Sequence, residues 1–276
     1  MLQIRQGGVY VDATVGLGGH AQEILGLMGP EGKVVGIDRD EAALMAARER
    51  LADERVVLVK GKFSELREIL TGTGMPEVDG VLFDFGVSMM QLKEPERGFS
   101  FSADEPLDMR MDRQQPLSAE DIVNDYPERE LERILREYGE EWSARKIARA
   151  IATYREKKRV TTCRELALIV SAVYRTRGKR HPATKTFQAL RIMVNDEINE
   201  IRKGLEAAAT VLRQGGRLCA ISYHSLEDRT VKHFLRDSHR DGLVRVVTKK
   251  PLSPSYDEVR ANPSARSARL RGAERT

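Results

Sequence analysis

Apolar residues gather in four short runs within the first ninety positions, and segments with helical spacing separate them. The runs are GVYVDATV at 8–15, KVVGIDRD at 33–40, VVLVKG at 56–61 and VDGVLFDFG at 78–86. Helices are predicted between them, from about His20 to Met28, Glu41 to Ala52 and Ser64 to Leu70. Strands that alternate with helices are typical of a parallel sheet covered by helices on both faces. The first part of the chain is therefore predicted to be an α/β sheet domain.

This alternation stops after Asp84, and helical spacing takes over. Apolar residues recur at intervals of three and four in LERILREYG at 131–139 and in WSARKIARAIATYREKK at 142–158. Sheet signals return at GGRLCAISYH, residues 215–224. We therefore predict a sheet domain in two segments, 1–105 and 191–276, the second ending in a basic tail. An all-helical domain, 106–190, is inserted between them and is predicted to recognise the substrate.

Composition excludes several classes of protein. The 41% apolar fraction is enough for a folded core, and the apolar runs are too short to cross a membrane or to form a signal peptide. Cys163 and Cys219 are far apart in sequence, and no CxxC pair or histidine cluster accompanies them. A disulfide framework and a zinc ribbon are therefore excluded, and no metal site is predicted. We expect a cytoplasmic protein without membrane contact.

The net charge of +4 hides a separation of charge along the chain. Acidic residues outnumber basic ones 13 to 5 from Asp104 to Glu141, whereas basic residues outnumber acidic ones 14 to 2 from Trp142 to Arg191. Solvated surfaces usually mix their signs, so a strongly basic stretch indicates a surface that faces a polyanion. Within it, RTRGKRHPATK at 175–185 contains a glycine and a proline and is predicted to be a phosphate-binding loop.

Glycines mark a candidate binding turn after the first strand. Gly16, Gly18 and Gly19 lie between that strand and a helix, where a ligand can approach the backbone closely. Asp38 ends the next strand, 20 positions after Gly18, and a carboxylate there can accept hydrogen bonds from both hydroxyls of a ribose. Gly16, Gly18 and Ala21 also satisfy the G-x-G-x-x-A spacing. This much fits NAD and S-adenosylmethionine equally.

The acidic residues at the strand ends favour S-adenosylmethionine. Asp12, Asp38 and Asp84 lie at or near the ends of the first, second and fourth strands. Carboxylates suit a cofactor that carries a sulfonium and an ammonium group, whereas they repel a pyrophosphate. In the loop after Asp84, Ser88 and Gln91 offer a hydroxyl and an amide for further hydrogen bonds.

Stretches along nearly the whole chain resemble one family. They are YVDATVGLGGH at 10–20, VVGIDRD at 34–40, DFGVSMMQL at 84–92, ERGFSF at 96–101, PLDMRMD at 106–112, HPATKTFQALRIMVNDE at 181–197, ISYHSLEDRTVKHF at 221–234 and NPSARSARLR at 262–271. In this order they resemble the RsmH or MraW family of bacterial methyltransferases, which act on the exocyclic N4 of a cytosine in the decoding centre of 16S ribosomal RNA.

The resemblance implies a class I (Rossmann-like) S-adenosylmethionine-dependent methyltransferase fold with an inserted helical domain. It implies a cofactor site with Gly18, Gly19 and His20 on the methionine side, Asp38 at the ribose, Phe63 near the adenine, and Asp84 and Gln91 completing the pocket. Asp84 is our candidate catalytic residue, as the acceptor for the amine proton. The implied partner is 16S ribosomal RNA in the small ribosomal subunit, and a homodimer is left open.

Two other functions stay open from the sequence. The glycine spacing allows an NAD-dependent oxidoreductase. A catalytically impaired RNA-binding protein on the same fold is the other, because Met89 and Met90 replace a Ser-Pro pair of the family. The family's His-x-Pro-Val segment is also not seen before the first strand.

Three residues outside the glycine turn carry local predictions. Glu105 replaces a glycine of the family and is expected in an exposed loop. Ser225, with Asp228 three positions later, is predicted to cap a helix from 226 to 236. His224, at the end of the preceding strand, is then left at the edge of the site.

Overall fold

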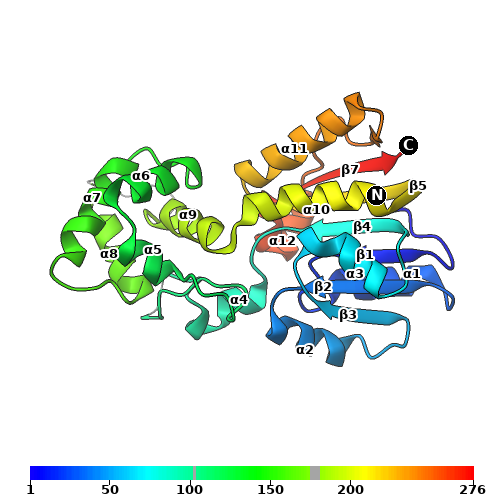
Figure 1. Cartoon of the computed structure of the whole chain (residues 1–276), viewed down its shortest axis with the longest axis horizontal. Coiled ribbons are helices and arrows are strands. Elements are labelled where there is room, and N and C mark those ends of the chain that lie inside the picture. Colours follow the sequence, from blue (N-terminus) through cyan, green and yellow to red (C-terminus); the bar gives the residue numbers. More distant parts are fainter. Residues whose placement is uncertain (102–103, 175–180) are drawn as a thin grey trace. The chain divides into compact units, whose positions relative to one another are not determined.

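The computed structural model describes residues 1–101, 104–174 and 181–276 (Figure 1). These residues form two compact units, one made of Met1–Gly86 with Ile198–Thr276 and the other of Val87–Glu197. Most of the predicted phosphate-binding loop, residues 175–180, lies outside the described residues. None of the described helices is both long and apolar enough to cross a membrane.

The first unit is built on a seven-stranded sheet of order β3-β2-β1-β4-β5-β7-β6. Strands β1 to β5 run parallel, while β7 pairs antiparallel with both β5 and β6. The strands are β1 (Val9–Asp12), β2 (Lys33–Asp38), β3 (Val56–Lys60), β4 (Val78–Asp84), β5 (Leu212–Ser222), β6 (Val244–Val246) and β7 (Arg269–Arg275). The helices are α1 (Gly19–Met28), α2 (Glu41–Arg50), η1 (Phe63–Glu65), α3 (Leu66–Gly72), α10 (Glu197–Val211), α11 (Ser225–Arg240), α12 (Tyr256–Ala261) and η3 (Pro263–Ser267). The predicted α/β sheet is confirmed.

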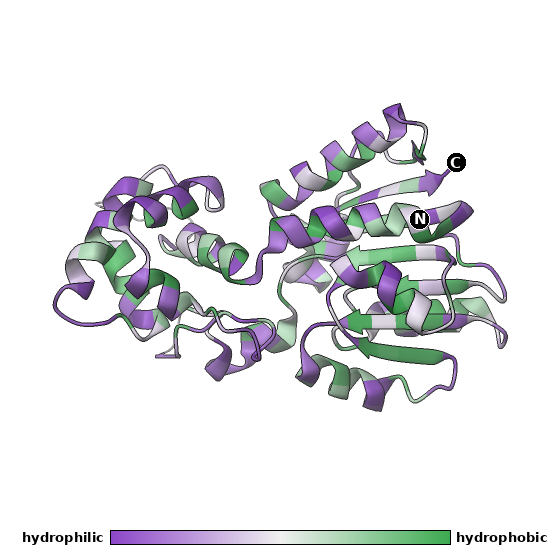
Figure 2. Cartoon of the chain, viewed as in Figure 1, coloured by the Kyte–Doolittle hydropathy of each residue, from purple (hydrophilic) through white to green (hydrophobic). Residues whose placement is uncertain are grey.

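Helices cover the sheet on both faces. Side chains alternate between the two faces along each strand, so neighbouring residues pack against different helices. On β1, Val11 packs in the core that includes residues of α3, α10 and α11. Its neighbour Tyr10 packs in the other core, with residues of α1 and α2. Strands that are buried on both faces have few polar residues, and Figure 2 shows hydrophobic positions concentrated along β1 to β4.

The carboxyl ends of the parallel strands place the acidic residues at one edge of the sheet. Asp12 ends β1, Asp38 ends β2 and Asp84 ends β4. Strand β1 lies between β2 and β4, so the chain turns in opposite directions on either side of it. In open α/β sheets, ligands bind outside the carboxyl ends of the strands at such a switch point.

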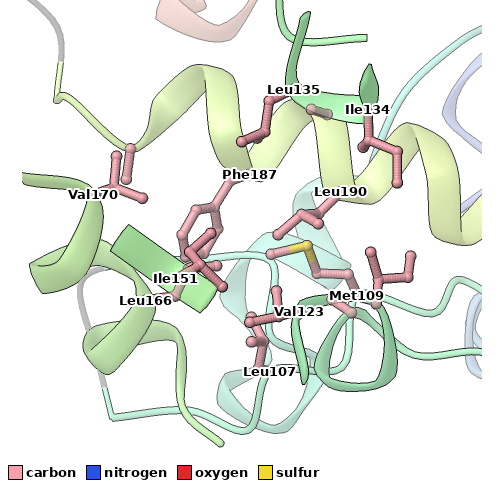
Figure 3. Close-up of a cluster of buried hydrophobic side chains, with 14 of the residues drawn as sticks. Leu107, Met109, Val123, Ile134, Leu135, Ile151, Leu166, Val170, Phe187 and Leu190 are labelled. Carbon is pink, nitrogen blue, oxygen red and sulfur yellow. The ribbon is translucent and has the colours of Figure 1, made fainter. Parts of the chain in front are cut away.

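The second unit has a helical core of its own. Its helices are α4 (Met89–Lys93), η2 (Pro95–Arg97), α5 (Ala119–Asp125), α6 (Glu128–Glu137), α7 (Ala144–Arg155), α8 (Cys163–Ala172) and α9 (Thr184–Asn195). Figure 3 shows side chains from α5 to α9 and from the segment before α5 meeting around Phe187 and Leu190. Ile134, Ile151 and Met109 belong to the same cluster, and each is almost fully buried.

The division between the compact units differs from the predicted domain limits. The units divide after Gly86 and after Glu197, whereas the sequence placed the limits after residues 105 and 190. The segment before 106 belongs with the helices because Phe99 packs in their core. The end of α9 is held there too, since the Asn195 side chain accepts a hydrogen bond from Met111 N and donates one to Met109 O, both at 2.8 Å.

The expectation of an exposed Glu105 is wrong. Its side chain is only 7% exposed, and its backbone carbonyl accepts a hydrogen bond from Cys163 N at 2.8 Å. This bond attaches the backbone of Glu105 to the start of α8, and the carboxyl group of Glu105 then lies inside the protein. Burial raises the pKa of Glu105.

Candidate functional site

A tight glycine turn connects the end of β1 to α1. Gly16 has φ +49° and Gly18 has φ +80°, conformations that glycine adopts far more readily than other residues. A Cβ atom at Gly18 would also lie 2.7 Å from Leu51 Cδ1. Gly19 and His20 are exposed, and space is open around Gly19. A ligand can therefore approach the backbone at the start of α1.

Asp38 ties this turn to the end of β2. Its Oδ2 accepts a hydrogen bond from Gly16 N and its Oδ1 accepts one from Asp40 N, both at 2.9 Å. Gly61 N donates to the backbone carbonyl of Asp38 at 3.0 Å, which brings the end of β3 alongside. Burial raises the pKa of the Asp38 carboxyl group. Each carboxylate oxygen keeps a second lone pair for a ligand.

Asp12 and Asp84 bring two further carboxyl groups to the same edge. Asp12 is fully buried, and its pKa is raised to about 6. Burial is the largest cause of this rise, the nearby His20 opposes it, and the negative charges of Asp84 and Asp38 add to it. Burial also raises the pKa of Asp84, and His20 Nδ1 lies 4.0 Å from its Oδ2. Among the described residues, none donates a hydrogen bond to Asp12 Oδ2 or Asp84 Oδ1.

This arrangement is suited to a cation and unsuited to an anion. Buried carboxyl groups that repel one another cost free energy unless a positive charge or a proton compensates them. A ligand with a positive group at this edge would supply that compensation, whereas a pyrophosphate would add to the repulsion. The geometry therefore favours S-adenosylmethionine, which is cationic, over NAD.

The sequence analysis did not predict two residues that lie at this edge. Thr14 Oγ1 accepts a hydrogen bond from Asp84 N at 2.7 Å, which joins the ends of β1 and β4. The Tyr223 hydroxyl interacts with the Asp84 carboxyl group and lowers its pKa, while burial together with Asp84 raises the pKa of Tyr223. Tyr223 directly follows β5. That position alone was a signal, because β5 is the next parallel strand beside β4.

The predicted cap of the following helix is wrong by one residue. His224, not Ser225, is the N-cap of α11, and its Nδ1 accepts from Glu227 N at 3.4 Å. Glu227 completes the cap by accepting from His224 N at 3.2 Å. The imidazole acceptor thus takes the place of the predicted hydroxyl, and the helix extends from Ser225 to Arg240. Asp228 instead binds Arg271 Nε at 2.7 Å.

Phe63 forms an aromatic group just beyond β3. Its ring meets Phe83 edge-on at 5.6 Å between centroids and lies 5.9 Å from Phe85. The Arg39 guanidinium lies 5.9 Å from the Phe63 ring centroid. Phe63 is half-buried, so part of its ring is left to contact a flat apolar ligand.

Six of the seven predicted site residues lie in the first unit, at the carboxyl edge of its sheet: Gly18, Gly19, His20, Asp38, Phe63 and Asp84. The seventh, Gln91, belongs to the second unit, where its Oε1 accepts a hydrogen bond from Ser88 N at 3.1 Å. Its place in the cofactor pocket stays a prediction.

The family profile and the relatives found by sequence agree on one family. The profile of the MraW methylase family matches residues 1–276. A ribosomal RNA small subunit methyltransferase H from Carboxydothermus hydrogenoformans is 48% identical over 99% of this chain and 94% of its own length. The protein of the same name from Persephonella marina is 50% identical over 98% of this chain and 93% of its own. A solved structure of a putative rRNA-methylase from Clostridium thermocellum has a TM-score of 0.47 and 16% identity, over 99% of this chain and 91% of that one.

Proposed function

Because this chain belongs to the MraW methylase family, we propose that it methylates the exocyclic N4 of a cytosine in the decoding centre of 16S ribosomal RNA. It is an S-adenosyl-L-methionine-dependent methyltransferase with a Rossmann-like sheet. Relatives named ribosomal RNA small subunit methyltransferase H support the substrate. The observation that carries the proposal is the group of fully or partly buried carboxyl groups at the ends of β1, β2 and β4.

The residues present fit S-adenosylmethionine. Asp12 Oδ2 and Asp84 Oδ1 are buried without a donor among the described residues, and they suit the positive charges of this cofactor. Gly18, Gly19 and His20 would flank its methionine part. Asp38 would accept from the ribose hydroxyls, and the Phe63 ring would pack near the adenine. We propose that Gln91, from the second unit, completes the pocket.

Catalysis rests largely on orientation. The cofactor supplies a methyl group on a sulfonium, and the cytosine amino nitrogen is a weak nucleophile because its lone pair is delocalised into the ring. Holding the two in line can supply roughly 7 to 11 kcal/mol. We propose that Asp84 accepts a hydrogen bond from the amine and then its proton, while Tyr223 and Thr14 hold Asp84 in place.

We further propose that the enzyme acts in the cytoplasm on RNA already assembled in the small ribosomal subunit. Small subunits and free 16S ribosomal RNA, both from cells that lack this modification, are incubated with the protein and isotopically labelled S-adenosylmethionine. Mass spectrometry of nuclease fragments should find one added methyl group on a decoding-centre cytosine, mainly with subunits. Methylation of another base or none would contradict the proposed function, and preference for free RNA would contradict the assembled substrate.

Replacing Asp38 by Ala should weaken S-adenosylmethionine binding about 10- to 100-fold. The change removes a charged acceptor for two ribose hydroxyls, and hydrogen bonds to charged groups contribute about 1.5 to 3 kcal/mol. It also removes the acceptor that holds Gly16 N. Isothermal titration measures the affinity, and a thermal melt checks that the fold is retained. Titration with NADH serves as the control, for which no binding is expected. An unchanged affinity for S-adenosylmethionine would exclude Asp38 from the site.

A further inference from the structure

We propose that Trp142 and the basic face of α7 bind a single-stranded segment of the RNA substrate. A base would stack on the indole, and phosphates would contact Arg145, Lys146 and Arg149. The inference rests on the proposed function in taking RNA as the ligand. It adds to that function a contact surface on the second unit.

The exposure of Trp142 is the first observation. Its side chain is 96% exposed, the highest value among the large hydrophobic residues exposed in the described parts of the chain. Tryptophan is normally largely buried, because its indole has a large apolar area. An indole held in solvent is therefore available to stack against a base, and such stacking tolerates any base.

A stripe of cations continues from Trp142 along the helix. Arg145, Lys146 and Arg149 lie at helical spacing in α7, which places these three residues on one face of the helix, and Trp142 lies two residues before the helix begins. The three cations are exposed, and they form no ion pair with any other described residue. On the neighbouring α6, by contrast, Arg133 pairs with Glu130 and Glu137. The α7 cations are thus left for an external anion.

The helix itself gains nothing from these cations. The amino end of an α-helix carries a partial positive charge, so basic residues are unfavourable in the first turn. Arg145 and Lys146 nevertheless lie there, and the first turn of α7 contains no acidic residue. A phosphate bound at this face would reverse the repulsion.

The turn that carries Trp142 is firmly anchored. Glu141 is only 6% exposed, and its Oε1 accepts a hydrogen bond from Ser143 N at 2.9 Å. The Tyr174 hydroxyl interacts with this carboxylate, which together with burial raises the pKa of Tyr174. On the opposite face of α7, Ile151 points into the buried cluster of Figure 3. Trp142 therefore projects from a rigid support, which lowers the entropy lost on binding.

Single-stranded RNA fits this surface better than a duplex does. Bases in a duplex are stacked on one another and do not offer a free face, whereas unpaired bases stack readily on aromatic side chains. The flanking cations match the phosphates of such a strand. An acidic protein partner would use the cations and leave the indole without a stacking partner.

The sole tryptophan of the chain makes the test direct. Indole fluorescence is recorded while an unlabelled twelve-nucleotide single-stranded RNA, or a hairpin of equal length, is added. The single strand should quench the emission and the hairpin should quench it little. By fluorescence anisotropy with a dye-labelled strand, Trp142→Ala should bind about tenfold more weakly, while Trp142→Phe keeps most of the affinity. Loss of Arg145, Lys146 and Arg149 together should lower the slope of log K against log salt by about 0.7 per contact.

Matched variants separate this surface from general effects. Arg133→Ala with Arg136→Ala removes ion-paired cations from α6, and Tyr256→Ala removes an exposed aromatic residue from the first unit. Both should bind the strand as the parent does. Equal affinity of Trp142→Ala and parent, or equal quenching by strand and hairpin, would overturn the inference. Neither result bears on methyl transfer by the parent protein, whose absence would count only against the proposed function.

Discussion

Replacing Asp12 by Asn should stabilise the ligand-free protein at pH 7 and weaken its binding of S-adenosylmethionine. Asp12 is fully buried with a raised pKa of about 6, against 3.8 for an unperturbed group. A difference of about two units corresponds to roughly 3 kcal/mol of unfolding free energy lost when the carboxyl group ionises. Asparagine does not ionise, so the variant avoids this loss. It also lacks the negative charge that faces the cofactor.

The dependence on pH distinguishes this explanation from a packing effect. Between about pH 4 and pH 6 the folded protein holds a proton on Asp12 that the unfolded chain has released, so stability falls as pH rises through this range. The difference in unfolding free energy between the Asn variant and the parent should therefore be small near pH 4. It should grow to its full value above about pH 6. Chemical denaturation at several pH values measures it, and a constant difference would contradict the assigned cause.

Replacing Asp84 by Asn should lower kcat for methyl transfer about 10²- to 10⁴-fold, the range typical for loss of a general base. The amide keeps the size of the side chain but accepts a proton poorly. Because burial raises the pKa of Asp84, kcat of the parent should fall on the acidic side as this carboxyl group becomes protonated. Methyl incorporation at saturating cofactor and RNA measures kcat. A near-normal rate in the variant would remove Asp84 from the chemistry.

Replacing Tyr223 by Phe should change the pKa of Asp84 while keeping its carboxyl group. The Tyr223 hydroxyl stabilises the ionised carboxylate of Asp84 and so lowers its pKa. Without it, the acidic limb of the kcat profile should move to higher pH, while the rate well above that limb changes much less. A purely structural role for Tyr223 would reduce the rate equally at all pH values.

The pattern of strands and helices predicted the sheet and the edge at which its acidic residues meet. This succeeded because buried parallel strands are short apolar runs, and polar residues at their ends stand out. The position of Asp38 at this edge could be predicted for the same reason, whereas its role in the site stays a prediction. Tyr223 was missed, because its position after β5 becomes a signal only once β5 is known to lie beside β4, and the insert separates these two strands in sequence.

Local chemistry limited the other predictions. His224 caps α11 through an imidazole nitrogen, a role that sequence rules assign first to Ser, Thr, Asp and Asn. Glu105 was expected in an exposed loop, yet pairing of its backbone with Cys163 accompanies its burial. The domain limits shifted because Phe99, outside any regular helix, packs with the helical core.

The insertion of the second unit between β4 and β5 affects how the chain folds as it is synthesised. Strand β4 emerges with β1 to β3, but its partner β5 follows only after residues 87–197. The 127 residues between Asp84 and Leu212 take roughly 6 to 25 s to synthesise at about 5 to 20 residues per second, and the apolar edge of β4 is left unpaired for that time. During this interval the insert can form its local helical contacts first, since these form faster than pairing between distant strands. The newly made chain is therefore most prone to aggregate before β5 arrives, and a chaperone that shields the edge of β4 would act in this window.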